Sequence, residues 1–270
     1  MAESGYALAE GHMTGPVHIG TSGWSYKSWE KTFYPPGVPA SRHFEYYATQ
    51  FSTVEINLTF YRLPTLKMVC GWRDKAPPGF VYAVKGSRFI THMKKLANLA
   101  GALDRFFERL EPLRRRVGVL LWQLPPVLRK DAPRLENFLA QLPHTYCHAV
   151  EFRHPSWVAP QIFELLEKHH IAHVSLSSLA MPMDLTVTSD IVYIRFHGLE
   201  GGAAHDYTRA ELAPWATHIR AQADCGRTVF AYFNNDANVR APGNAKMLRE
   251  MLEHQGAPAR HGREPELAAG

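Results

Sequence analysis

Short apolar runs alternate with amphipathic helical patterns along most of the chain. The helical patterns, with apolar side chains at i, i+3, i+4 and i+7, occur at residues 44–51, 103–110, 135–142 and 212–219. Nearly continuous apolar strands between such helices are typical of a parallel sheet covered by helices. The strand candidates are VHIGTSG, STVEIN, FVYAVK, VGVLLWQ, CHAVEF, IAHVSLS, IVYIRFHG and TVFAYFNN. Eight such units favour an α/β fold of the closed (β/α)8 type, a TIM barrel.

The sixth βα unit is irregular, because the segment SLAMPMDLTVTSD shows no helical pattern. Residues 17–255 are expected to form a single domain, since barrels of about 200–250 residues fold as one unit. The segments 1–16 and 256–270 are polar and rich in small residues, and we expect flexible tails there.

Cysteine content and hydropathy bear on the location of the protein. Three cysteines without a CxxC pair favour free thiols in a reducing, cytoplasmic environment. The first residues lack the apolar core of a signal peptide, and no run approaches the ~18 apolar residues of a membrane span. We therefore expect no association with a membrane.

The charge balance is mildly basic, with 30 Lys and Arg against 25 Asp and Glu and a formal net charge of +5. Such a bias suits a small anionic ligand, whereas nucleic acid is a less favoured partner. No GxGxxG or P-loop occurs, so no cofactor is expected. No metal site is expected either, because HxH and HExxH are both absent.

Several of the apolar runs end in charged residues, which a buried strand should avoid. The run before Glu151 is an example, and Glu55 and Arg195 stand in the same position in two other runs. Side chains alternate across a strand, so these charges can point into the barrel while their apolar neighbours face the helices. Charge inside a barrel is costly unless it is paired, and the carboxyl ends of barrel strands are where active sites form.

The same alternation assigns further polar side chains to the barrel interior, where they would form a cation-enriched site. They are His18, Ser22, Asn57, Lys85, Gln123, Arg153, His173, Ser175, Ser177, Tyr193, His197, Tyr232 and Asn234. Aromatic residues fall beside the same mouth, where they can stack on a sugar or a base or close the core. These are Trp24, Tyr26, Tyr61, Trp122, Trp157 and Tyr207.

A series of motifs resembles the YecE-like family, the domain-of-unknown-function family numbered 72. The motifs are GTSGWSYKSWEKTFYPPG, VEINLTFYRLP, VKGSRFITH, QLPP, VEFRHPSW, YIRFHG and AYFNNDA, within residues 17–252. The resemblance implies a TIM barrel of unassigned activity. It also points to Glu55, Lys85, Gln123, Glu151, Arg153, Arg195, His197, Tyr207, Asn234 and Asn235.

The first functional hypothesis is an enzyme that acts by acid/base chemistry on a small phosphorylated or otherwise anionic substrate, with sugars among the candidates. Glu55, Glu151 and His197 are the predicted catalytic residues. Both glutamates can equally be ion-pair partners that hold the barrel mouth together. The predicted substrate-binding residues are Lys85, Gln123, Arg153, Arg195, Tyr207, Tyr232, Asn234 and Asn235.

Two alternatives stay open. The first is a metal-dependent phosphodiesterase or endonuclease-like DNA-binding barrel, which rests on fold analogy and basicity. The second is a non-catalytic protein that binds the same anionic ligand without turning it over.

Overall fold

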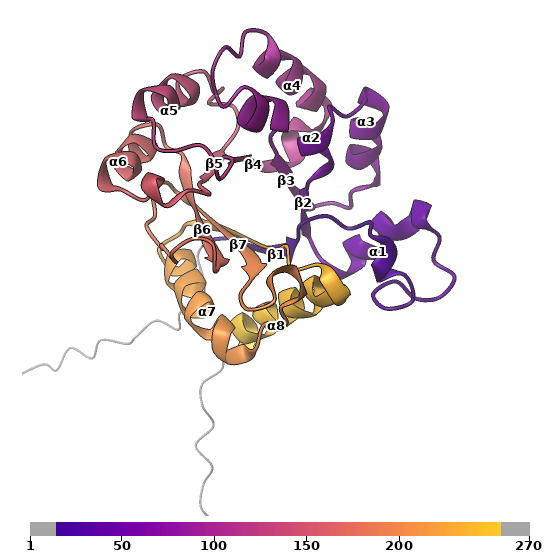
Figure 1. Ribbon diagram of the computed structural model, residues 1–270. Coiled ribbons are helices and arrows are strands. Elements are labelled where there is room, and N and C mark those ends of the chain that lie inside the picture. Colours follow the sequence, from indigo (N-terminus) through magenta and orange to yellow (C-terminus); the bar gives the residue numbers. More distant parts are fainter. Residues whose placement is uncertain (1–14, 255–270) are drawn as a thin grey trace, which may run out of the picture.

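The structure, a computed structural model, describes residues 15–254. Eight parallel strands form a ring in the order β1-β8-β7-β6-β5-β4-β3-β2, and helices surround it (Figure 1). Strands that follow one another in the chain are neighbours in the ring, which is the arrangement of a (β/α)8 barrel. The predicted fold class is confirmed.

The strands are β1 (Val17–Thr21), β2 (Thr53–Ile56), β3 (Val81–Lys85), β4 (Val117–Gln123), β5 (His148–Glu151), β6 (Ala172–Ser178), β7 (Ile191–Gly198) and β8 (Thr228–Phe233). The α-helices are α1 (His43–Gln50), α2 (Leu58–Tyr61), α3 (Leu66–Lys75), α4 (Ala102–Leu110), α5 (Ala132–Leu139), α6 (Pro160–Lys168), α7 (Arg209–Asp224) and α8 (Arg240–His254). No helix lies between β6 and β7, so the sixth unit is irregular as predicted.

Residues 15 and 16, just before β1, are hydrogen-bonded to the barrel. The predicted tails lie outside the described residues except for Gly15 and Pro16. The backbone N–H of Gly15 donates to the carbonyl of Ala223 in α7, and the carbonyl of Pro16 accepts from Val229 in β8. No helix among residues 15–254 is long and apolar enough to cross a membrane.

The predicted orientation of β6 is wrong. Its residue His173 is in register with Val150, which faces the helices, and Leu176 is in register with the inward Arg195. His173 therefore points outward with Ser175 and Ser177, and its ring lies 5.0 Å from that of Phe163 in α6. Burial lowers the pKa of His173 to about 4, so the neutral imidazole is compatible with this apolar layer.

A tyrosine side chain completes the seam between β1 and β2. The backbone ladder is reduced there to one bridge, between Ser22 and Glu55. The hydroxyl of Tyr47 in α1 accepts a hydrogen bond from the N–H of Thr21 at 3.0 Å and donates one to the carbonyl of Thr53 at 3.0 Å. Tyr47 thus substitutes for part of the missing ladder and brings the β2 carboxylate to the mouth.

Replacing Tyr47 with Phe should lower the free energy of unfolding by about 1–3 kcal/mol, because two buried backbone groups lose their partner. Urea denaturation followed by circular dichroism measures the change. Tyr46→Phe is the control, since Tyr46 is partly exposed and its hydroxyl makes no hydrogen bond to any described residue. We expect a change below about 0.5 kcal/mol there. Equal stability of the two variants would refute a role for Tyr47 in the seam.

Candidate functional site

Arg195 joins two carboxylates at the centre of the barrel mouth. Its side chain is 1% exposed, and its Nε and Nη2 atoms donate to both oxygens of Glu55, at 2.9 and 2.7 Å. Its Nη1 atom donates to Glu151 at 2.6 Å. The three residues come from β7, β2 and β5, which are separate parts of the ring (Figure 1). Arg195 therefore holds three distant strands together.

Glu55 has every lone pair directed at a protein donor. Ser22 donates to it at 2.7 Å and Tyr193 at 2.7 Å, in addition to the two bonds from Arg195. Burial alone would raise the pKa of Glu55, but the Arg195 charge outweighs it and lowers that pKa. This geometry favours the ion-pair role that the sequence left open.

Glu151 is the common acceptor for the more exposed side of the cluster. Its Oε1 atom accepts from Gln123 at 2.7 Å and from Arg153 at 2.9 Å, and its side chain is fully buried. Burial would raise its pKa, but Arg195 and then His197 hold the pKa well below the usual range. The carboxylate is therefore ionised at neutral pH and carries no proton to donate.

His197 lies between the two arginines. Its Nε2 atom is 3.1 Å from Nη1 of Arg153 and 3.2 Å from Nη1 of Arg195, and its Nδ1 atom is 3.1 Å from the side-chain amide of Asn234. Burial and the Arg195 charge lower the pKa of His197, so the imidazole is neutral at pH 7. Because arginine can only donate, Nε2 faces both guanidinium groups with the lone pair of the neutral ring, and this nitrogen can accept a proton.

The mouth carries an excess of positive charge. Lys85 ends β3 close enough to Arg195 and the two glutamates for their charges to affect its pKa. Three cations, Lys85, Arg153 and Arg195, face two carboxylates, Glu55 and Glu151, and 3 − 2 leaves one positive charge. Such a site attracts an anion.

Most of the predicted site residues meet at this mouth. The cluster contains Glu55, Lys85, Gln123, Glu151, Arg153, Arg195, His197 and Asn234. Three others lie apart from it. Tyr207 packs outside β7 with its hydroxyl 2.8 Å from Ser177, Tyr232 bonds to Thr53 at 2.6 Å, and Asn235 donates to Asn244 at 2.7 Å. These contacts support the barrel and its loops.

Two residues near the mouth were not predicted from the sequence. His92 lies in the π-helical turn Phe89–Met93 after β3, and burial together with the charges of Lys85 and Arg88 lowers its pKa. Asp236 follows β8, accepts a hydrogen bond from the Trp29 indole, and has a pKa raised by burial to about 6. Both lie within motifs that carry the family resemblance, VKGSRFITH and AYFNNDA, and their place in these motifs could have indicated them.

An aromatic cavity of about 580 Å³ lies beside the ends of β1 and β2. Trp24, Tyr26 and Tyr61 line it, as does Asn57, whose buried Oδ1 atom has no hydrogen-bond partner among the described residues. Of the aromatic residues predicted at the mouth, these three therefore lie together beside the ends of β1 and β2. Trp122 and Trp157, by contrast, are fully buried among core residues.

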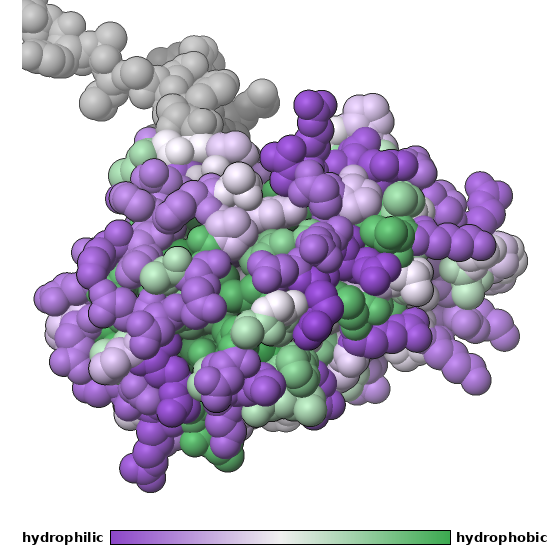
Figure 2. Space-filling view, turned by 90° about the horizontal axis from the view of Figure 1, so that it is seen from above, coloured by the Kyte–Doolittle hydropathy of each residue, from purple (hydrophilic) through white to green (hydrophobic). Residues whose placement is uncertain are grey.

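A second hydrophobic hollow, of about 410 Å³, shares Tyr61 and Arg62 with the aromatic cavity and extends it toward Phe89 and Met93. Figure 2 shows the flank that faces upward in Figure 1, where hydrophobic residues form an irregular band between hydrophilic ones. An apolar part of a ligand can lie in these hollows, next to the charged cluster.

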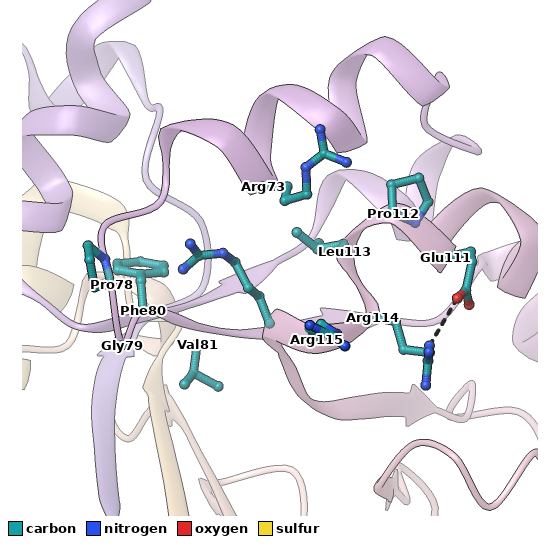
Figure 3. A pocket seen from close by; sticks show the side chains of 11 residues that line it. Arg73, Pro78, Gly79, Phe80, Val81, Glu111, Pro112, Leu113, Arg114 and Arg115 are labelled. Carbon is teal, nitrogen blue, oxygen red and sulfur yellow. Dashed lines mark hydrogen bonds and ion pairs between the residues drawn. The ribbon is translucent and has the colours of Figure 1, made fainter.

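A basic cavity of about 630 Å³ lies near the amino ends of β3 and β4, at the opposite end of the barrel. Figure 3 shows its arginine side chains, with Arg114 paired to Glu111 at 2.9 Å. The other lining arginines are Arg73, Arg115 and Arg116. Because this cavity is far from the strand tips, binding of an anion there would be separate from the cluster around Arg195.

The cluster does not have the composition of a metal centre. Among residues 15–254, no group of three or more His, Cys, Asp or Glu side chains is placed so that it could hold a metal ion. Both glutamates instead direct their oxygens to guanidinium groups.

A family model described as a protein of unknown function, DUF72, matches residues 18–268. The chain belongs to the DUF72 family. The UPF0759 protein YecE of Escherichia coli K12 is 32% identical over 144 residues, which cover 53% of this chain and 50% of that protein. The chain thus spans about half the length of this relative in the match. The UPF0759 protein YunF of Bacillus subtilis is 24% identical, with 88% of this chain and 95% of that protein covered.

Solved DUF72 structures share the fold. A DUF72 protein from Thermotoga maritima has a TM-score of 0.80 and 28% identity, covering 88% of this chain and 99% of that chain. One from Enterococcus faecalis has a TM-score of 0.77 and 18% identity, covering 88% and 95%. The DUF72 assignment that the motifs suggested is confirmed.

Proposed function

We propose that this DUF72 protein is an enzyme that binds a small anionic substrate, such as a sugar phosphate, at the carboxyl ends of the strands. The observation that carries the proposal is the excess positive charge beside a neutral histidine. Arg153 is the accessible cation, with a side chain 24% exposed against 1% for Arg195. A cytoplasmic location belongs to the proposal, and the three free cysteines are compatible with it.

Arg153 is suited to bind the anionic group. Its hydrogen bonds to other residues of the described chain use Nη1, which contacts Glu151 and His197. Nε and Nη2 are thus available as a planar pair of donors, and this pair matches two oxygens of a phosphate or carboxylate. Bound there, the anion would lie next to the His197 imidazole.

His197 is the proposed proton acceptor. Its lowered pKa keeps the ring neutral at pH 7, and Nε2, which faces two arginine donors, is the nitrogen without a proton. Once the ring takes a proton, the Glu151 carboxylate, 3.4 Å from Nε2, stabilises the imidazolium. Glu151 thus supports the proton transfer through charge, while Gln123 and Asn234 hold the carboxylate and the ring in place.

Inorganic phosphate should raise the melting temperature of the wild-type protein by roughly 5–10 °C at 100 times its Kd. Arg153→Met should weaken phosphate binding by at least about tenfold, because a charge-assisted bidentate contact contributes about 1.5–3 kcal/mol. A thermal-shift titration with and without Mg²⁺ measures both effects.

Arg114→Met is the matched control, since Arg114 lies at the basic cavity on the opposite end of the barrel. A phosphate response that disappears in Arg114→Met and persists in Arg153→Met would contradict the proposal. If the melting temperature rose only with short DNA in the presence of Mg²⁺, and not with phosphate, the endonuclease-like alternative would be favoured. Binding of a sugar phosphate that is recovered unchanged after long incubation would favour a protein that binds without catalysis.

A further inference from the structure

Lys85 is a nearly buried amine without a bonded counter-charge. Its backbone is fixed at the end of β3, because its carbonyl accepts a hydrogen bond from Thr59 at 2.6 Å and its Cα is in register with Leu121 of β4. The residue is 8% exposed, and Nζ lies 4.2 Å from the centre of the Phe60 ring. A lysine whose only task was structural would normally be paired when buried this deeply.

The nearby carboxylates are engaged elsewhere. Glu55 and Glu151 direct their oxygens to Arg195, Arg153 and neutral donors. Within residues 15–254, Nζ of Lys85 makes no hydrogen bond or ion pair. The ammonium form has thus lost most of its hydration without gaining a bonded anion, and this favours the neutral amine.

The charge state of Lys85 agrees with this geometry. Burial, with a further contribution from Arg195, lowers the pKa of Lys85 to about 8 from 10.5. At pH 7 roughly one tenth of the amine is then neutral, about 300-fold more than for an ordinary lysine. Neutral lysines made by desolvation or by a neighbouring cation are the ones that attack carbonyl groups.

We propose that Lys85 is a nucleophile that forms an imine with the carbonyl group of an anionic aldehyde or ketone. The Nζ lone pair forms a C–N bond while the carbonyl π electrons move to oxygen, which takes up a proton as nitrogen loses one. The carbinolamine then expels its hydroxyl group, which leaves as water with one added proton. One amine, one carbonyl and one proton therefore give a protonated imine and one water.

His92 is placed to exchange these protons. The ring centroids of His92 and Phe60 are 4.9 Å apart in an edge-to-face arrangement, and the Lys85 amine lies over the same Phe60 ring. Its pKa is lowered by burial and by the charge of Lys85, so the imidazole is neutral at pH 7. Its Nδ1 atom is 2.9 Å from the Thr91 hydroxyl, which orients the ring.

The substrate class rests on the proposed function, because Arg153 would hold the anionic group while the carbonyl carbon meets Lys85. The test incubates the full-length protein at pH 8 with sodium cyanoborohydride and either dihydroxyacetone phosphate or dihydroxyacetone. Peptide mass mapping then gives the rate of reductive alkylation at each lysine.

Lys85 should react at least about tenfold faster than the exposed Lys67, with the phosphate ester faster than the uncharged ketone. Lys85→Arg keeps the charge and should abolish the fast labelling, whereas Lys67→Arg should remove the slow site alone. Circular dichroism confirms folding of both variants. Labelling of Lys85 no faster than that of Lys67 in the folded protein would overturn the imine.

The two proposals fail in different ways. If phosphate binds through Arg153 while Lys85 reacts no faster than Lys67, the proposal of an imine at Lys85 is wrong and the proposed anion site at Arg153 is supported. If Lys85 reacts equally fast with both ketones and Arg153→Met leaves phosphate binding unchanged, the imine is supported and the anion site is wrong.

Discussion

Replacing Arg195 with Met is expected to lower the free energy of unfolding at pH 7 by about 3–5 kcal/mol, the cost of leaving buried charges unpaired. The substitution keeps most of the side-chain volume. It removes the arginine that pairs with the fully buried Glu55, and it leaves the fully buried Glu151 with Arg153 alone. Loss of packing alone would cost less, because Met fills irregular space well.

The pH dependence distinguishes lost pairing from lost packing. In the wild type, the pKa values of Glu55 and Glu151 are below the ordinary 4.5, so their pairing stabilises the fold above that pH. This contribution is lost as the pH falls through the lowered pKa values. Without Arg195, burial is expected to raise the pKa of Glu55 in particular, since Glu151 still has Arg153 beside it. Protonation of Glu55 then removes the unpaired buried charge as the pH falls from 7 towards 5. The stability gap should therefore narrow on acidification.

Urea denaturation at pH 7, 6 and 5 measures this gap. Arg114→Met is the control, because Arg114 forms an exposed ion pair with Glu111 and should change stability by less than about 1 kcal/mol at each pH. If the difference in unfolding free energy between wild type and Arg195→Met stayed constant across this range, Arg195 would stabilise the fold through packing rather than through charge.

The strands and the central ion pairs could be predicted because two independent constraints agree there. A charge that ends an apolar run must find a partner, and the period of a strand leaves it two faces to choose between. For Glu55, Glu151 and Arg195 the interior is the face that provides opposite charges. For β6 the argument fails, because on the helix-facing side Ser177 bonds to Tyr207 and the neutral ring of His173 packs against Phe163.

The rest of the site depends on contacts between residues distant in sequence. Tyr207 lies outside the barrel because the chain turns back after β7 and packs the ring 5.4 Å from the outward Phe196. His92 lies in a five-residue π-helical turn and Asp236 in an irregular segment, and both segments are too short for a periodicity to indicate a direction. The unpaired state of Lys85 follows from the pairing of both glutamates with Arg195, which no local pattern shows.

Replacing Glu151 with Gln should destabilise the protein by about 2–4 kcal/mol, although the shape of the side chain is conserved. Glu151 accepts from Gln123, Arg153 and Arg195, and an amide would turn one acceptor oxygen into a donor facing other donors. The charge excess at the mouth would rise by one. Exposed Glu164→Gln is the control, with an expected change below about 0.5 kcal/mol.

The same substitution should alter the chemistry of the mouth in a defined direction. Glu151 raises the pKa of Lys85, so its loss should lower that pKa below about 8 and move the pH profile of reductive alkylation to lower pH. Phosphate should bind roughly tenfold more tightly, since one negative charge near the anion is removed. An unchanged alkylation profile in the folded variant would show that Glu151 is not the counter-charge of Lys85. A profile that shifts while Glu164→Gln leaves it in place would connect the buried ion pairs of the barrel to the reactivity at its mouth.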